Sequence, residues 1–204
     1  MTRPSAAAEV NLDLARTERI GFGEAVLADS KSVGQLVAVL ERAEAAGVSM
    51  LLTRLRTDQF SALPTSYRQR LDYEPDSRTA FFGPSSPLGT EIEVAVVTAG
   101  TSDVPVAREA VRTLQFSGIC ALEVCDVGVA GLWRLQQRLT ELKTMRVIVA
   151  VAGMDGALPT VLGGLVPALV IAVPTSIGYG VAEGGVTGMR AMLASCAPGL
   201  VVVN

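Results

Sequence analysis

The chain has 204 residues, half of them hydrophobic, and a formal net charge of −3. This length can bury a sizeable core, and the lack of a basic surplus excludes the usual electrostatic attraction to nucleic acid. Apolar runs such as Val147–Ala152 are far shorter than the roughly 20 residues that cross a bilayer, so they predict buried strands. No continuous apolar signal-peptide region follows Met1, and we expect a cytoplasmic protein without membrane contact.

The first part of the chain contains one clear helix signal followed by a strand. Leucine, valine and alanine recur at helical spacing from Ser32 to Ala46. Ser32 is a suitable N-cap for this helix, and Gly47 is a suitable stop. A strand is predicted over Val48–Leu55.

A change in composition marks a domain boundary. The loop Phe82–Gly89 holds two glycines, two prolines and two serines between patterned segments. Such clusters are typical of connections between units. The chain is therefore predicted to consist of a small α/β domain over residues 1–88 and a second domain over residues 89–204.

The second domain repeats an apolar run, a glycine-containing turn and a segment of helical period. The predicted strands are Glu93–Thr98, Leu122–Cys125, Val147–Ala152, Leu169–Val173 and Leu200–Val203, and the predicted helices are Val104–Phe116, Ala130–Leu142 and Gly185–Leu193. Strands that are apolar throughout favour a parallel sheet covered on both faces. The fold class predicted is α/β: a three-layer, doubly wound parallel sheet of the flavodoxin-like type.

Small and polar residues follow the carboxyl ends of these strands. In parallel sheets ligands bind at this edge, where loops and helix N-termini present free backbone N–H groups. The candidate substrate-binding residues are Gly100, Ser102, Asp103, Asp126, Gly128, Gly153, Thr175, Ser176, Gly178 and Tyr179.

Two of these loops have a structural interpretation beside the functional one. Ser102 and Asp103 could hold a phosphate or ribose, or could only cap the following helix. Asp155 follows a strongly apolar strand, where partial desolvation would raise its pKa and suit it to proton transfer. It could equally be an N-cap.

The cysteines and the absence of histidine limit the chemistry. There are three cysteines and no histidine, so the commonest acid/base group and metal ligand near neutral pH is missing. Cys120 and Cys125 flank or lie in an apolar strand and favour core positions. Cys196 follows a helix, before a turn at Pro198 and Gly199, and an accessible thiol there could be a nucleophile.

Several motifs, taken together, resemble the LarB family, which makes the first intermediate of the nickel-pincer nucleotide cofactor. The segments that carry this resemblance are DLARTERIGFGEAVLADSKS, AVVTAGTSDVPVAREA, DVGVAGLWRL, VIVAVAGMDGALPTVLGGL, VIAVPTSIGYG and MLASCAPGLVVVN. The sequence differs from the family pattern at Gly23, where proline is usual, and at Trp133, where histidine is usual. The C-terminal part is similar to aminoimidazole ribonucleotide carboxylases and mutases.

The resemblance implies a substrate, a product and two catalytic residues. The substrate would be nicotinic acid adenine dinucleotide, carboxylated by CO2 at C5 of its pyridinium ring and hydrolysed at its phosphoanhydride. The products would be pyridinium-3,5-biscarboxylic acid mononucleotide and AMP. Cys196 matches the family's nucleophile and Asp155 a carboxylate important to activity, and a homo-octamer is implied.

The implied reaction depends on the thiolate as a source of electrons. The pyridinium ring cannot attack CO2, but addition of the Cys196 thiolate at C4 makes C5 an enamine carbon. After C5 attacks CO2, Asp155 removes the C5 proton, and expulsion of the thiolate restores the aromatic ring. This carboxylation requires no cofactor. A magnesium ion bound by substrate phosphates would leave little trace in the motifs, so its part in hydrolysis stays open.

Three alternatives stay beside this interpretation. An enzyme of the aminoimidazole ribonucleotide type is disfavoured because that chemistry is associated with an active-site histidine. A divergent relative could act on another pyridinium nucleotide such as NAD. A non-catalytic nucleotide-binding module would use the same loops but would not need an accessible thiol at Cys196.

Overall fold

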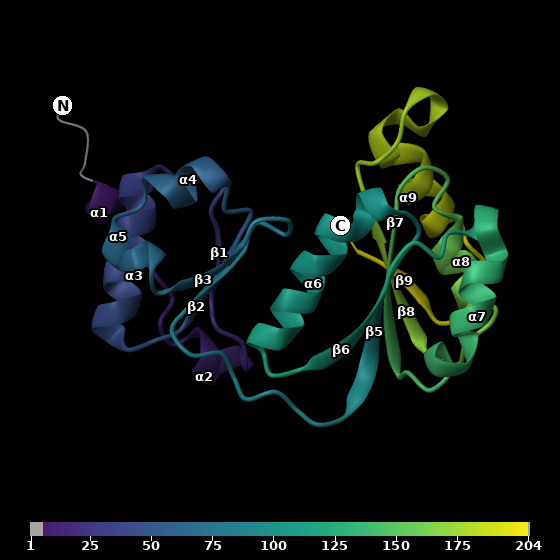
Figure 1. Ribbon diagram of the computed structural model, residues 1–204, viewed down its shortest axis with the longest axis horizontal. Coiled ribbons are helices and arrows are strands. Elements are labelled where there is room, and N and C mark those ends of the chain that lie inside the picture. The colour runs from purple at the N-terminus through teal and green to yellow at the C-terminus, as the bar shows by residue number, and fades with distance from the viewer. Residues whose placement is uncertain (1–5, 204) are drawn as a thin grey trace. The chain divides into compact units, whose positions relative to one another are not determined.

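The computed structural model describes residues 6–203, which form two compact units. The first unit runs to Pro87 and includes Phe116–Gly118, and the second comprises Leu88–Gln115 and the chain from Ile119 onward. Each unit has its own sheet and its own hydrophobic core (Figure 1).

The first unit is a small α/β domain around a four-stranded sheet of order β1-β2-β4-β3. Its strands are β1 (Ala25–Leu27), β2 (Met50–Thr53), β3 (Leu71–Glu74) and β4 (Thr79–Phe82), and its helices are α1 (Ala6–Glu9), α2 (Arg16–Ile20), α3 (Val33–Ala46), α4 (Thr57–Ala62) and α5 (Thr65–Arg68). Strands β1 and β2 are parallel, whereas β4 pairs antiparallel with β2 and with β3.

The predicted start and end of α3 are confirmed. The Ser32 side chain accepts a hydrogen bond from the backbone N–H of Gln35, whose side chain accepts one from Ser32, so the pair forms a capping box. Gly47 ends the helix in the left-handed conformation at φ 65°. The strand predicted over Val48–Leu55 is shorter and covers only Met50–Thr53.

The second unit contains a parallel sheet of five strands. These are β5 (Ile92–Thr98), β6 (Cys120–Val124), β7 (Val147–Ala152), β8 (Leu169–Pro174) and β9 (Leu200–Val202), in the order β6-β5-β7-β8-β9. All neighbours pair in parallel. This is the strand order of flavodoxin-like folds, in which the direction of winding reverses beside the first strand of the unit, between β5 and β7.

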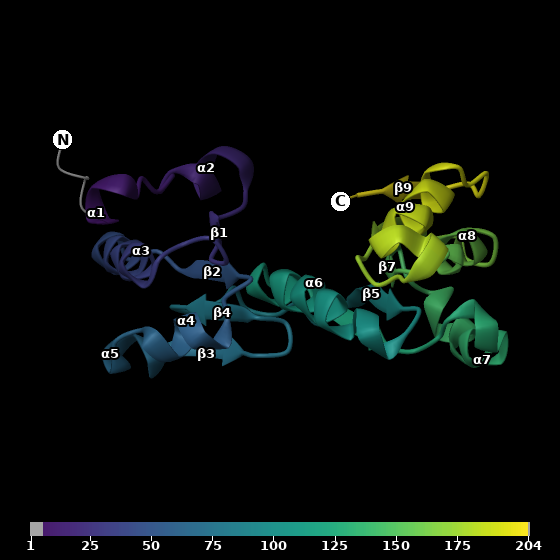
Figure 2. The same ribbon diagram turned by 90° about the horizontal axis from the view of Figure 1, so that it is seen from above.

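Helices cover the two faces of this sheet and make it three-layered. The helices are α6 (Val104–Phe116), α7 (Leu132–Leu142), α8 (Ala157–Gly163) and α9 (Val186–Leu193). Ala107 and Val111 of α6 pack on Val96 and Val151. The alternate side chains of the strands face the other way and pack against α7, α8 and α9. Figures 1 and 2 show α7 and α8 on the side of the sheet away from α6.

The predicted strands and long helices of this unit are confirmed, with ends shifted by up to two residues. The helix predicted from Ala130 begins as a 3-10 turn over Val129–Gly131 and continues as α7. Helix α8 was not expected from the sequence. Within residues 6–203, none of the helices is long and apolar enough to pass through a lipid bilayer.

Candidate active site at the carboxyl edge of the parallel sheet

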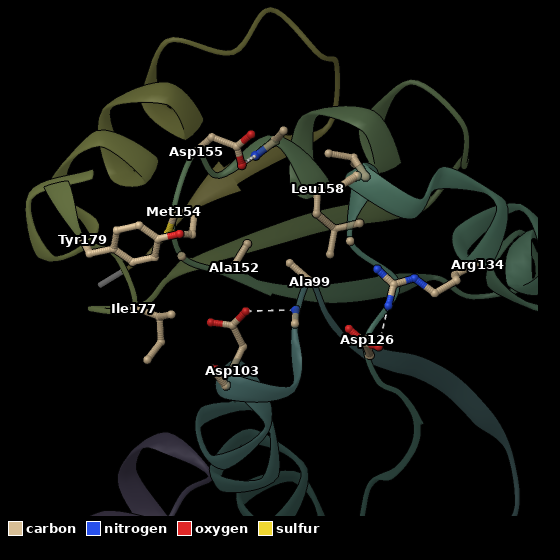
Figure 3. Close-up of a pocket in the computed structure, with 17 residues that line it drawn as sticks. Ala99, Asp103, Asp126, Arg134, Ala152, Met154, Asp155, Leu158, Ile177 and Tyr179 are labelled. Atoms are coloured by element: carbon tan, nitrogen blue, oxygen red, sulfur yellow. Dashed lines mark hydrogen bonds and ion pairs between the residues drawn. The ribbon is translucent and has the colours of Figure 1, made fainter. Parts of the chain in front are cut away.

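A cavity of about 430 Å³ lies at the carboxyl ends of the strands of the second unit. It lies where the winding reverses between β5 and β7, the usual ligand position in this kind of sheet. Of the candidates, eight line it: Gly100, Ser102, Asp103, Asp126, Gly128, Gly153, Asp155 and Tyr179. Figure 3 shows their side chains and those of the neighbouring lining residues around one hollow.

Two loops around the cavity have a left-handed backbone at residues other than glycine. Asp126 follows β6 with φ 58°, and Met154 follows β7 with φ 49°. This conformation is uncommon for such residues and is found preferentially at functional sites. The observation supports a functional role for these loops.

Two glycines allow neighbouring loops to approach each other closely. A Cβ on Gly128 would lie 2.5 Å from the carbonyl oxygen of Ala99, and one on Gly153 would lie 2.1 Å from that of Ile177. No side chain fits at such separations. The backbone N–H of Met154 donates to the same Ile177 oxygen at 2.7 Å, which ties the loop after β7 to the loop after β8.

Asp103 is a buried carboxylate with two donors. Its Oδ1 accepts a hydrogen bond from the Thr175 hydroxyl at 2.7 Å, and its Oδ2 accepts one from the Gly100 N–H at 3.1 Å. Burial raises the pKa of Asp103, and these two hydrogen bonds oppose the rise. Asp103 therefore stabilises the loop that precedes α6 and also presents a carboxyl group to the cavity.

Asp155 lacks the burial that one of its two sequence interpretations requires. The side chain is exposed, so the desolvation expected after an apolar strand is absent in the single chain. Its Oδ1 accepts a long hydrogen bond of 3.4 Å from the N–H of Ala157, the first residue of α8. The carboxylate thus helps to cap a helix and also lines the cavity.

Arg134 is a lining residue that the sequence analysis missed. It lies in the first turn of α7, and its Nη1 donates to Oδ2 of Asp126, with which it forms an ion pair. An arginine on an amphipathic helix is ordinarily a surface residue, so its sequence context gives no sign of this role. The one feature of the sequence that relates to this role is that Arg134 follows Asp126 by eight residues.

The opposite side of the cavity is apolar, and its main residues were also missed. Met154, Leu158 and Ile177 line it beside the predicted Tyr179. The Tyr179 side chain is 81% exposed, so most of the ring can meet a ligand. In Figure 3, Tyr179, Met154 and Asp155 lie on one side of the hollow, and Arg134 with Asp126 lies on the other.

Three predicted pocket residues do not line the cavity, and two of them, Thr175 and Gly178, support it from outside. Thr175 is buried and holds Asp103. A Cβ on Gly178 would lie 2.9 Å from the Cβ of Ala182, so glycine at this position lets the loop after β8 pack closely. Ser176 is exposed and is not among the lining residues.

Cys196 is exposed but lies at the opposite edge of the sheet. It belongs to the loop before β9, whose Leu200 is in register with Val170 near the amino end of β8. The following Ala197 and Pro198 meet Gly163 at the end of α8. Strand β8 has six residues, which at about 3.3 Å each separates the two edges by about 17 Å. Within one chain the thiol and the cavity do not meet.

The two other cysteines are less buried than the apolar pattern suggests. Cys120 is partly buried, and its thiol donates to the carbonyl oxygen of Gly89 at 3.0 Å. Cys125 is exposed, which corrects the core position expected for it. Partial desolvation of its thiol by neighbouring atoms and the nearby Glu123 carboxylate raise the pKa of Cys125, which disfavours the reactive thiolate.

Comparison with known families agrees with this architecture. Residues 6–84 match the LarB/PurE-like N-terminal domain, and residues 93–203 match the AIR carboxylase domain. The chain belongs to the LarB family. An uncharacterized protein of Methanocaldococcus jannaschii, MJ0165, is 34% identical over 202 residues, which cover 96% of this chain and 78% of the relative.

LarB-family membership gives the chain a general chemical role. The two domains, in this order, assign a carboxylase- or mutase-type role in LarB-like biosynthesis, with a nucleotide-related substrate and use of CO2. Among residues 6–203, no group of three or more His, Cys, Asp and Glu side chains is arranged to hold a metal ion.

Proposed function

We propose that the cavity binds nicotinic acid adenine dinucleotide and that the enzyme carboxylates C5 of its pyridinium ring. The observation that carries this proposal is the division of the cavity into two chemically different sides. Asp103 and Asp155 lie toward the apolar side near Tyr179, whereas the guanidinium of Arg134 lies on the other side (Figure 3).

This division suits a nucleotide that carries both a cationic ring and phosphates. A pyridinium ring can stack on Tyr179 and lie near carboxylates, which favour its positive charge. The residues Asp126 and Asp155 follow β6 and β7, which are separated by β5. Two strand spacings of about 4.8 Å place them about 10 Å apart, and this leaves room for a ribose between the ring and the phosphate.

In the proposed reaction the Cys196 thiolate forms a bond to C4 of the ring, and the ring nitrogen receives the electron pair. C5 then forms its bond to CO2. Asp155 takes the C5 proton, and the thiolate leaves C4 with its electron pair, so that the aromatic ring returns and the cysteine is regenerated. The thiolate supplies and recovers the electrons, and the carboxylation requires no cofactor.

The position of Cys196 requires a second copy of the chain. The thiol lies at the amino edge of the sheet and the cavity at the carboxyl edge, so one chain cannot combine them. We propose that a homo-oligomer, of eight chains by family resemblance, brings Cys196 of one copy to the cavity of another. A neighbouring copy would also shield Asp155 and the bound ring from water.

The second half of the proposed reaction is hydrolysis of the phosphoanhydride. Water attacks one phosphorus and the bridging oxygen leaves with the other phosphate, which gives AMP and the biscarboxylated mononucleotide. A magnesium ion held chiefly by the two substrate phosphates would neutralise the charge on the leaving group.

The test is incubation of the protein with nicotinic acid adenine dinucleotide and ¹³C-bicarbonate, followed by mass spectrometry. The proposal predicts a labelled carboxylated mononucleotide together with AMP. Cys196→Ser abolishes the product because a serine alkoxide is scarcely formed near neutral pH. Cys120→Ser, which also lies near the amino edge of the sheet, is the matched control and retains activity. An unchanged dinucleotide with turnover of NAD would reassign the substrate, and turnover by Cys196→Ser would remove the cysteine from the mechanism.

A further inference from the structure

The lining of the cavity carries more acidic than basic side chains. Among the described lining residues, Asp103, Asp126 and Asp155 carry carboxyl groups, and Arg134 is the sole cationic side chain. The phosphates of any nucleotide in this cavity would therefore have one guanidinium as their cationic protein partner. That guanidinium already has a carboxylate partner in Asp126.

The two partners of this ion pair differ in how firmly they are held. The backbone of Asp126 is fixed, because its N–H donates to the Thr98 hydroxyl at 2.9 Å and the next N–H, of Val127, donates to the Thr98 carbonyl at 3.0 Å. Arg134 reaches the carboxylate through a long side chain. Its guanidinium lies against Gly131, where a Cβ would be only 2.8 Å from Nε.

We propose that Arg134 and Asp126 form an exchangeable ion pair, in which the phosphate of the bound nucleotide takes the place of the Asp126 carboxylate. This inference rests on the proposed function, since it takes the ligand of the cavity to be a nucleotide. Asp126 keeps the guanidinium at the cavity before the ligand arrives. The same carboxylate then competes with the phosphate and lowers its affinity.

The exchange has a consequence for turnover. An anhydride phosphate carries one negative charge, whereas the terminal phosphate of a mononucleotide carries up to two near neutral pH. Asp126 lies beside the phosphate position, so it repels the more highly charged mononucleotide more strongly. The Asp126 carboxylate therefore favours release of the mononucleotide product, because it offsets part of the added attraction to Arg134.

The experiment measures binding of two probes by calorimetry, nicotinic acid mononucleotide and the riboside that lacks its phosphate. Arg134→Gln weakens binding of the mononucleotide by about ten- to a hundredfold, the usual effect of losing a charged hydrogen bond, and leaves the riboside unchanged. Asp126→Asn strengthens binding of the mononucleotide severalfold, and more so at low salt. In the Arg134→Gln background the gain is smaller, because only the repulsion by Asp126 is then removed and no guanidinium is left to release.

Arg138→Gln is the matched control. Arg138 lies one turn further along α7, is paired with Glu141 and does not line the cavity, so its replacement leaves the affinity for both probes unchanged. Asparagine is well tolerated in the left-handed conformation of residue 126. Thermal unfolding of each variant checks that the second unit is intact.

Two results would overturn the exchange and leave the proposed function standing. One is an equal loss of affinity for both probes in Arg134→Gln, which would mean that the arginine supports the fold of the site. The other is weaker mononucleotide binding in Asp126→Asn, which would mean that Asp126 contacts the ligand directly. If the unmodified protein binds neither probe, the proposed function is overturned, and the exchange with it.

Discussion

Replacement of Gly153 by alanine tests whether close contact between two loops forms the cavity. A Cβ at this position would lie 2.1 Å from the carbonyl oxygen of Ile177, 2.7 Å from the Thr175 hydroxyl and 2.8 Å from the Ile177 Cβ. Ordinary contact begins at 3.4 Å, so the Ile177 carbonyl would have to move by about 1.3 Å. Because that carbonyl accepts a hydrogen bond from the backbone N–H of Met154, the movement would also break the bond that joins the two loops.

The expected cost of Gly153→Ala is about 2–4 kcal/mol, from overpacking together with one lost backbone hydrogen bond. For a chain of this size, each kcal/mol lowers Tm by about 2–4 °C. The assay is calorimetric unfolding of the variant beside Gly164→Ala, whose added Cβ would meet its nearest atom at an ordinary 3.6 Å. Gly164→Ala should unfold like the parent protein. If Gly153→Ala did so too, and still bound nucleotide, the described loop geometry would be refuted.

Two predictions concern the buried carboxyl group. Thr175→Val removes the hydrogen-bond donor to Asp103 Oδ1 and so raises the pKa of Asp103 further. It should lower the free energy of unfolding at neutral pH by about 1–3 kcal/mol. The control Ser176→Ala, at the exposed neighbouring position, should change the free energy of unfolding by less than about 0.5 kcal/mol. Burial raises the pKa of Asp103 in the folded state above its ordinary value of 3.8. The protonated Asp103 side chain therefore contributes fully to stability below pH 3.8. This contribution is lost as the pH rises through the folded-state pKa. In urea unfolding across this range, the stability of the parent protein relative to Asp103→Asn should therefore fall with rising pH, and a difference that stays constant would contradict the raised pKa.

The regular elements of the second unit could be predicted because their patterns are strong. The continuous apolar run Val147–Ala152 has the same bounds as β7, and Val104–Phe116 has those of α6. Helix α8 was missed because its sequence holds Pro159 and is flanked by glycines. Pro159 is tolerated there because it is the third residue of the helix, within the first turn, where the backbone N–H has no partner in the helix.

The site could be predicted only in part, because composition identifies loops and not the side chains that turn toward each other. Glycines and hydroxyls after the strands indicated the edge of the sheet at which the cavity lies. Arg134 and Ile177 were missed because an arginine on a helix and an isoleucine in a loop have no distinctive pattern. Cys196 was recognised through family resemblance, but a loop that leads from a helix into a parallel strand lies at the amino edge, away from the cavity.

Mixed oligomers test whether one copy supplies the cavity and another supplies the thiol. Cys196→Ser and Asp155→Asn should each be inactive alone. When the two variants are co-expressed in equal amounts and mixed assembly is verified by native mass spectrometry, about a quarter of the cavities combine an intact Asp155 with an intact Cys196 from a neighbour. Recovery of a corresponding fraction of carboxylation is expected, and mixed oligomers without any activity would show that Cys196 does not reach the cavity of a neighbouring copy.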